Sequence, residues 1–459
     1  MGTPTTTQQT DGLDTPSRSG RTLTRTDIAW VSGAVALVVL AVAVPVMAGE
    51  GLRGRIFARA APLFAQWDPH TGPGTIAAIA VAVAAIIWLP RWAHRLRWSV
   101  LLAILWLTSV AWTMSLALVD GWQRGFAGRL VRPDEYLSEV PGVQSVPGML
   151  DTFAGRILDH QPDSWTTHVS GHPPGALLTF VWLDRIGLGG GAWAGAWCVL
   201  VGCSGLVAVL VTLRHLDAEA AARRCAPFLA LFPGLVWVGV SADGYFMGVA
   251  AWGVACVAIA TSASRQQRLR SAVFAILGGL LLGWAIFCNY GLVLIGVVAM
   301  AVLLAARTAR PLIWAIPSAL AVVGVFRAFG FWWFEGYLLV VERYYQGIAS
   351  LRPATYWMWA NLAATVFAVG PAGAAGIGRV VAARRWRDPV VLLAIAGLLA
   401  ILAADVSALS KAETERIWLP FGVWVMVSTA LLPARGARVW LCAQAILALA
   451  VNHLVLTYW

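Results

Sequence analysis

Residues 120–175 read DGWQRGFAGRLVRPDEYLSEVPGVQSVPGMLDTFAGRILDHQPDSWTTHVSGHPPG, a long polar segment between stretches that are almost wholly apolar. Acids and three histidines are concentrated in it, although only 12% of the chain is charged. Membrane proteins keep such groups where water reaches them, because burying one in hydrocarbon costs several kcal/mol. The sequence therefore predicts that this segment is a water-facing working surface between membrane-spanning helices.

The composition of the whole chain is that of an integral membrane protein. Of its 459 residues, 59% are hydrophobic, and the mean hydropathy is +0.74. A soluble fold carries roughly a quarter charged residues, about twice the fraction in this chain. We therefore expect an all-α, polytopic membrane protein. The net charge of +11 fits arginines on cytoplasmic loops that face anionic lipid, so no nucleic-acid partner is expected.

Apolar runs of sufficient length predict about 13 transmembrane helices. They are expected at 28–48, 74–90, 98–118, 192–213, 226–241, 244–262, 271–289, 291–308, 311–327, 355–378, 389–406, 417–433 and 437–456. The first two lie in an N-terminal region, 28–97, ahead of a core at 98–459. Residues 1–27 are polar and lack the apolar stretch of a signal peptide, which predicts a disordered cytoplasmic tail.

Arginines indicate which loops face the cytoplasm. Arg91, Arg95 and Arg97 form a basic turn before the third expected span, so the loop that follows that span, 119–175, is expected outside. The next apolar run, 176–187, is too short to cross and is expected to be interfacial or re-entrant. With this arrangement the polar loops gather on the extracytoplasmic side, where we expect an active or binding site.

The motif Arg-Pro-Asp-Glu-Tyr begins at Arg132, shortly after an expected span. A carboxylate of Asp134 or Glu135, held near the membrane surface, can take a proton from an acceptor hydroxyl. Its pKa would rise with desolvation and fall beside Arg132. A helix cap or a solvated loop acid is the alternative interpretation.

The motif Thr-His-Val-Ser-Gly-His-Pro-Pro-Gly opens the short apolar run. Two prolines stiffen this entry and cost no hydrogen bond in the first turn of a helix. His168 and His172, four residues apart, are candidate donors to a phosphate, and a rigid corner without chemistry is the alternative. No HExxH motif or cysteine pair accompanies them, so neither a metal nor another cofactor is expected.

Two further polar sites lie at the ends of apolar spans. Asp243 is a candidate catalytic acid, and a turn acid at the membrane interface is the alternative. Lys-Ala-Glu-Thr-Glu-Arg opens a later span, and there Lys411 and Arg416 can clamp a phosphate. Either Glu413 or Glu415 would hold these cations in place. Interfacial snorkelling is the alternative for this segment.

The order of these motifs resembles that of the GT-C superfamily of membrane glycosyltransferases. An acidic pair in a long first external loop precedes HPP at the next hydrophobic segment, and an Asp follows between later spans. The resemblance covers about 98–262. It implies a polytopic helical fold with a long extracytoplasmic first core loop and a polyprenyl-phosphate sugar as donor. Actinobacterial members, whose Arg- and Ala-rich composition is similar, transfer mannose or arabinofuranose.

The resemblance also implies roles for particular residues. Asp134, with Glu135 beside it, would be the catalytic base, Asp243 the second-loop acid, and Lys411 and Arg416 the holders of the lipid phosphate. The full candidate set is Asp134, Glu135 and Asp243 for catalysis and His168, His172, Arg343, Tyr344, Lys411, Glu415 and Arg416 for substrate binding. The sequence has no clear DxD motif, so a metal-dependent mechanism is not implied.

We therefore expect an inverting glycosyltransferase of the bacterial plasma membrane that acts in cell-envelope glycan synthesis. Its partners would be a polyprenyl-phosphate sugar donor, a glycan, lipid or protein acceptor, and membrane lipids. The alternative is a transporter or flippase of a lipid-linked or polar solute, which predicts internal repeats and broken helices at mid-membrane. A non-catalytic scaffold is a third hypothesis, and it would tolerate the combined loss of Asp134, Asp243 and Lys411.

Overall fold

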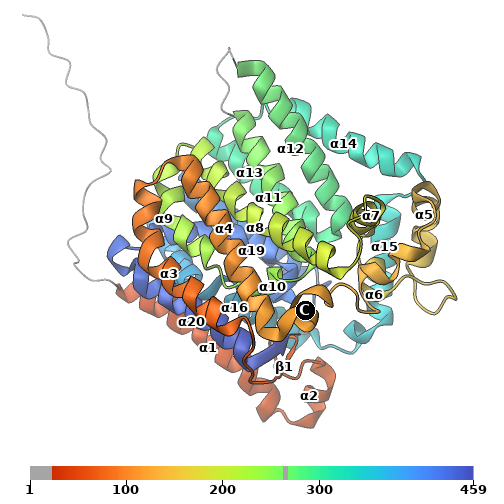
Figure 1. Cartoon of the computed structure of the whole chain (residues 1–459), viewed down its shortest axis with the longest axis horizontal. Coiled ribbons are helices and arrows are strands. Elements are labelled where there is room, and N and C mark those ends of the chain that lie inside the picture. The colour runs from red at the N-terminus through yellow and green to blue at the C-terminus, as the bar shows by residue number, and fades with distance from the viewer. Residues whose placement is uncertain (1–22, 262–266, 458–459) are drawn as a thin grey trace, which may run out of the picture.

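The computed structural model describes residues 23–261 and 267–457, and these ranges fold into a helical bundle (Figure 1). Its longer helices are α1 (Arg25–Met47), α3 (Thr75–Arg95), α4 (Trp98–Ala117), α7 (Pro174–Arg185), α8 (Gly191–His215), α9 (Glu219–Ala230), α11 (Ala242–Thr261), α12 (Arg268–Cys288), α13 (Ile295–Ala306), α14 (Leu312–Ala328), α15 (Trp333–Gln346), α16 (Ala354–Ala383), α17 (Pro389–Val406) and α20 (Ala437–Leu454). The shorter elements are α2 (Glu50–Ile56), α5 (Val146–Thr152), α6 (Thr167–Ser170), α10 (Leu235–Val238), α18 (Thr414–Ile417), α19 (Leu419–Val425) and the strands β1 (Ala65–Trp67) and β2 (Val455–Thr457).

Nine helices in these two ranges are long and apolar enough to cross a membrane. They are α1, α3, α4, α8, α11, α12, α16, α17 and α20. Helices α14 and α15 meet at an angle of 73° and would add a tenth if they form one broken span. The expected all-α, polytopic membrane fold is confirmed.

Four of the 13 expected spans are shorter or broken helices. These regions are 226–241, 291–308, 311–327 and 417–433. The first is divided at Pro233 into α9 and α10, because proline cannot donate a helical hydrogen bond. The last consists of α19 and a 3₁₀ turn and follows directly on α18. The other two hold the 12-residue α13 and the first half of the bent pair. The expected short element at 176–187 is the 12-residue helix α7.

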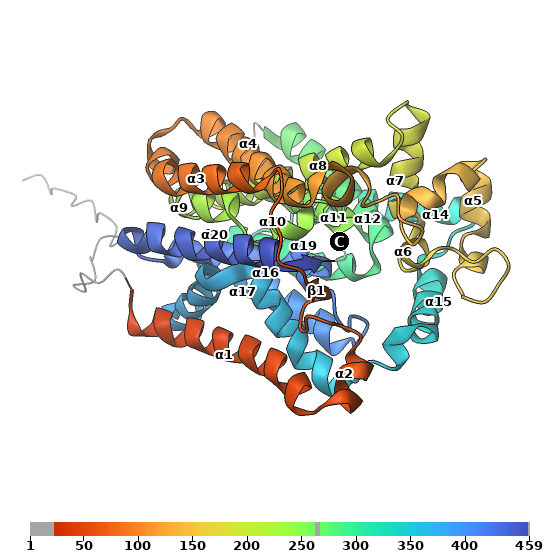
Figure 2. The same cartoon turned by 60° about the horizontal axis from the view of Figure 1, so that its bottom comes forward.

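Helices α8 and α11 form the buried centre of the bundle. They pack along each other, and α11 also packs along α12. At the first contact Gly205 faces Gly248, where an added Cβ would lie only 3.0 Å from the opposing Cα. Glycine thus lets two membrane helices approach closely. Figure 2 shows α3 and α4 on one side of the molecule and α1 on the opposite side, with α20 between them.

Helix α1 is fixed to α16 by an ion pair between a buried acid and a half-buried arginine. The Thr24 hydroxyl accepts a hydrogen bond from the Asp27 N–H at 3.3 Å and so caps the helix. The fully buried Asp27 carboxylate accepts two hydrogen bonds from Arg379, at 2.6 and 2.9 Å. The helix begins at Arg25, inside the region expected as a tail. Residues 1–22 of that region lie outside the residues that the structure describes.

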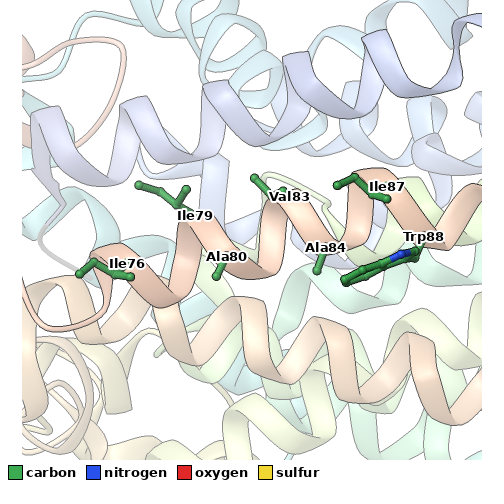
Figure 3. Close-up of a pocket in the computed structure, with 7 residues that line it drawn as sticks. All are labelled: Ile76, Ile79, Ala80, Val83, Ala84, Ile87 and Trp88. Carbon is green, nitrogen blue, oxygen red and sulfur yellow. The ribbon is translucent and has the colours of Figure 1, made fainter.

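The outer face of α3 is apolar. A hollow of about 420 Å³ is lined there by seven residues between Ile76 and Trp88, all from α3 (Figure 3). None of the seven is ionisable, and the Ile76 side chain is widely exposed. This surface is suited to membrane hydrocarbon and carries none of the chemistry expected of the site.

A two-stranded antiparallel sheet ties the polar loop to distant parts of the chain. Strands β1 and β2 pair with Ala65 opposite Thr457. Arg129 donates a hydrogen bond to the Thr457 carbonyl at 3.2 Å, and its guanidinium lies 3.5 Å from the Asp120 carboxylate. The start of the loop at 119–175 is therefore anchored next to this sheet.

Candidate active site

The acidic pair Asp134–Glu135 is held against the histidine-proline motif. The Asp134 carbonyl accepts a hydrogen bond from the His168 backbone N–H at 3.0 Å and lies 2.8 Å from the His168 ring Nδ1. The Glu139 carboxylate accepts a hydrogen bond from the Thr166 N–H at 2.9 Å. These bonds fix the backbone of the acidic pair although the two motifs are far apart in sequence.

The two carboxylates of the pair have different surroundings. The Asp134 side chain is 36% exposed and lies 3.5 Å from Arg132 Nε. The Glu135 side chain is 8% exposed, and its Oε1 lies 3.6 Å from His168 Nδ1. Burial raises the pKa of Glu135; the nearby positive charges oppose this rise, and the neighbouring acids add to it. Asp134 is thus accessible to a substrate, while Glu135 faces inward.

His172 packs against Tyr136, the residue that follows the acidic pair. Its Nδ1 lies 2.8 Å from the His168 carbonyl, and its ring centre lies 5.7 Å from that of Tyr136 and 5.6 Å from that of Phe246. Burial lowers the pKa of His172 to about 4, so the ring is neutral at neutral pH. Both predicted histidines reach the site, where their hydrogen bonds hold the loop in place. Over the described ranges, no group of three or more His, Cys, Asp or Glu residues could hold a metal ion.

Arg416 lies close to the acidic pair, bound between two acids. Its Nη1 donates a hydrogen bond to Asp243 at 2.5 Å, and its Nη2 donates one to Glu413 at 2.9 Å. Arg416 and Asp243 are 5% and 1% exposed. Burial lowers the pKa of Arg416, but the charges of these acids and of Glu135 raise it above the ordinary arginine value. Asp243, expected as a catalytic acid, is therefore placed to position this arginine.

Glu413 bridges two arginines. One carboxylate oxygen binds Arg416, and the other lies 3.8 Å from Arg352 Nη1. Ala412 and Glu413 have φ angles of 82° and 66°, a left-handed conformation that costs about 1–2 kcal/mol per residue. Asn361 supports it, because its Oδ1 accepts a hydrogen bond from the Ala412 N–H at 3.2 Å. The backbone of this segment is strained into the shape that presents Glu413 to both cations.

Arg352 and Lys411 form what we call the basic cluster. Arg352 donates a hydrogen bond to the Lys411 carbonyl at 2.6 Å, while its buried Nε and Nη2 have no hydrogen-bond partner in the described part of the chain. The Lys411 Nζ donates one to the Ala349 carbonyl at 2.9 Å and lies 5.1 Å from the Tyr345 ring centre. Tyr344 Oη accepts a hydrogen bond from the Lys411 N–H at 2.8 Å. Buried guanidinium donors without acceptors are suited to binding an anion.

Arg343, predicted to contact the phosphate, is bound to the polar loop. It forms an ion pair with Asp159, and its Nε donates a hydrogen bond to Ser170 Oγ at 3.2 Å. The ion pair lowers the pKa of Asp159. Arg343 therefore ties α15 to the loop, next to α6.

Glu415, also predicted at the substrate site, binds a different partner. Its fully buried carboxyl accepts a hydrogen bond from the Phe64 backbone N–H at 3.4 Å. Burial raises the pKa of Glu415 to about 7. The sequence left open whether Glu413 or Glu415 holds the cations, and in the structure Glu413 holds Arg416.

Two residues of the site were absent from the predicted set. Arg352 lies at the end of a polar loop, directly before a proline that precedes an apolar span, and nothing in the sequence separates it from other loop arginines. Asn361 is a polar residue within the apolar α16, and such a residue is costly enough in a membrane span to have been a signal.

No protein-family model and no curated protein matches this sequence. Among solved structures, the apo oligosaccharyltransferase of Archaeoglobus fulgidus is similar, with a TM-score of 0.51 and 12% identity over 79% of this chain and 57% of that one. ArnT from Cupriavidus metallidurans bound to undecaprenyl phosphate matches with a TM-score of 0.46 and 17% identity over 71% of this chain and 59% of that one. The chain thus spans less than three fifths of the length of either protein.

The likeness to the oligosaccharyltransferase establishes the fold. This chain has the fold of that protein, in keeping with the polytopic helical fold that the resemblance of its motifs to the GT-C superfamily implies. With nine or ten apolar helices in the described ranges, it is a multi-pass membrane protein of that fold.

Proposed function

We propose that the protein is a membrane glycosyltransferase that moves a sugar from a polyprenyl-phosphate donor to an acceptor hydroxyl. The proposal rests on one observation: the carboxylates of Asp134 and Glu135 lie in the same site as buried arginines, and Arg352 has two N–H donors, Nε and Nη2, without a hydrogen-bond acceptor in the described part of the chain. Glu413 joins Arg416, which lies near the acidic pair, to Arg352 of the basic cluster. The GT-C fold supports the same assignment.

Asp134 is the base of the proposed reaction. Its side chain is accessible, and its backbone is fixed by His168. The proton of the acceptor hydroxyl passes to the Asp134 carboxylate while the acceptor oxygen forms a bond to the anomeric carbon of the sugar. The bond from that carbon to the phosphate oxygen breaks on the opposite face, so the configuration inverts and polyprenyl phosphate leaves.

Arg352 and Lys411 stabilise the leaving phosphate. Negative charge grows on the phosphate oxygen as its bond to the sugar breaks, and fixed donors in a buried site stabilise such charge strongly. The free Nε and Nη2 of Arg352 are available for this purpose. Removing one such donor typically lowers the rate by on the order of 10²–10³-fold.

The sugar, the acceptor and the location follow from the motif resemblance. We propose mannose or arabinofuranose as the sugar and a glycan, lipid or protein as the acceptor. The active site would lie on the extracytoplasmic side of a bacterial plasma membrane, in cell-envelope synthesis. The grouping of the polar loop with α15 and α18 around one site supports this placement.

The test is sugar transfer by purified protein in native lipid, given labelled polyprenyl-phosphate mannose or arabinofuranose and membrane extract as acceptor. Asp134→Asn should lower transfer about 10²–10⁴-fold, because the base is lost. Donor binding should stay within about twofold, because Asp134 does not touch the phosphate in this mechanism.

The matched control is Asp163→Asn, the same change at a loop acid that is 67% exposed. It should transfer sugar at the wild-type rate. An active Asp134→Asn variant would contradict the assignment of the base, and loss of transfer in Glu135→Gln instead would move that role to the neighbouring acid. Absence of transfer and of donor binding in the wild type would contradict the proposed function.

A further inference from the structure

A cavity of about 650 Å³ lies outside the site described above, where α1 meets α2. Val42, Pro45 and Val46 from the end of α1 line it, together with Ile56 and Phe57 from the end of α2 and the turn that follows. One wall of this α1–α2 cavity is therefore apolar. The proposed transfer mechanism makes no use of it.

Charged side chains line the same cavity. Arg53, Arg59 and Glu50 contribute to it, which gives the lining a net positive charge. Neither arginine forms an ion pair within the described ranges of the chain, and both are exposed. Arg55 lies on α2 together with Arg53 but does not line the cavity. Arginine is suited to binding phosphate through two parallel hydrogen bonds.

The apolar wall continues onto the membrane-facing surface of α1. Val46 is 58% exposed and Met47 is 83% exposed, at the end of a helix that is long and apolar enough to span a membrane. A ligand with an anionic head and a hydrocarbon chain would therefore place its head on the arginines and its chain along α1. The combination points to a lipid phosphate.

The α1–α2 cavity shares a wall with the basic cluster. Phe64 lines the cavity, and its ring centre lies 5.2 Å from the Arg352 guanidinium. Ile348 also lines the cavity and precedes Ala349, whose carbonyl binds Lys411. A ligand in the cavity is thus separated from the proposed phosphate site by a single layer of side chains.

We propose that the α1–α2 cavity is a second binding site for polyprenyl phosphate, which holds the lipid on its way between the bilayer and the basic cluster. The identity of the lipid rests on the proposed function, while the existence of the site rests on the cavity, its arginines and its apolar wall. A bulk phospholipid could make the same contacts with the arginines and the apolar wall. The wall that the cavity shares with the basic cluster favours polyprenyl phosphate, the lipid of the proposed reaction.

The test is photo-crosslinking of a diazirine-bearing polyprenyl phosphate to the full-length protein in nanodiscs, with the crosslinked peptides mapped by mass spectrometry. We expect crosslinks within 42–64 in the wild type. The double variant Arg53→Gln, Arg59→Gln should lose these at least tenfold, because both head-group donors are removed. Arg55→Gln is the matched control and should crosslink like the wild type.

Competition identifies the lipid. Unlabelled polyprenyl phosphate should displace the probe from 42–64, and the same concentration of phosphatidylglycerol should not. Equal displacement by both would overturn the proposal in favour of an ordinary phospholipid, and so would undiminished crosslinking in the double variant. Asp134→Asn should crosslink like the wild type. If the wild type transfers no sugar but still gives arginine-dependent crosslinks, the proposed function is contradicted and this site is left standing.

Discussion

Single residues in this site are held by several partners at once. Arg416 is bound by Asp243 on one nitrogen and by Glu413 on another, and Glu413 also reaches Arg352. Buried charges need such pairing, because an unpaired one loses its hydration without compensation. A substitution at any of these positions therefore changes the orientation of the others.

The variant Asp243→Asn should show whether Asp243 acts by positioning Arg416 or by contacting the substrate. The amide cannot hold Arg416 as an ion pair, so Arg416 would shift toward Glu413 and disturb the basic cluster. We expect kcat to fall about 10²-fold with less than a threefold change in donor KM. Steady-state kinetics with labelled donor measures both.

The matched control is Asp120→Asn, which also breaks ion pairs of a buried acid, but in the group with Arg124 and Arg129. Its kcat at a permissive temperature should match the wild type. An equal loss of kcat in both variants would mean that Asp243 acts only through general stability.

Among the elements, α1 illustrates how a helix at the edge of the bundle is joined to it. Its outer face is apolar and exposed, and the Asp27–Arg379 pair gives it a fixed partner in α16. The apolar run of α1 was predictable from sequence. The pair was not, because its two residues are separated by most of the chain and each reads as an ordinary charge beside a membrane span.

Asp27→Asn should destabilise the protein by about 3 kcal/mol, because it leaves the half-buried Arg379 without its charged partner. Thermal unfolding in detergent measures this change. Asp163→Asn, at an exposed acid 3.7 Å from Arg156, should change stability by less than about 0.5 kcal/mol. Equal unfolding temperatures for wild type and Asp27→Asn would refute the importance of the pair.

The elements also mark the limits of sequence reasoning. Long, uninterrupted apolar runs such as α8 and α11 were predicted within a few residues. In regions 226–241 and 417–433, prolines or short helices interrupt the apolar sequence. Hydropathy predicted one continuous span for each region, whereas the structure has several short helices there. Arg416 lies in the short helix α18, directly before the second of these regions, so an irregular part of the chain carries this residue.

At the scale of the whole molecule, motifs from four distant parts of the chain meet at one site. The acidic pair and the HPP motif were predicted to act together, and the structure joins them through His168. The meeting of Asp243 with Arg416 was not specified, because side-chain pairing between separate spans depends on how the bundle packs. Arg352 entered the site for the same reason.

The proposed orientation makes a prediction about the intact cell. A cysteine at Asp163, in the polar loop, should react with a membrane-impermeant maleimide, while one at the exposed Arg387, between α16 and α17, should react only after lysis. Labelling followed by gel detection measures this in a Cys442→Ser background, because the other cysteines are buried. Labelling of Arg387→Cys in intact cells, without labelling of Asp163→Cys, would show that the membrane orientation is opposite to the proposed one.

The raised pKa of Glu135 links lipid binding to proton uptake. Glu135, Asp243 and Glu413 balance Arg352, Lys411 and Arg416 in charge, so a bound phosphate adds uncompensated negative charge. This charge should raise the pKa of Glu135 further and draw a proton onto it. Binding is then strengthened at low pH and weakened as the pH rises through the pKa of the bound state.

Calorimetry can detect this coupling. Polyprenyl phosphate binding should give different heats in two buffers of unequal ionisation enthalpy, and the difference should disappear in Glu135→Gln. Equal heats in the wild type would show that no proton is taken up. If the coupling holds, release of the spent lipid phosphate returns a proton to the water, and the acidity outside the membrane helps to set how quickly the site is emptied.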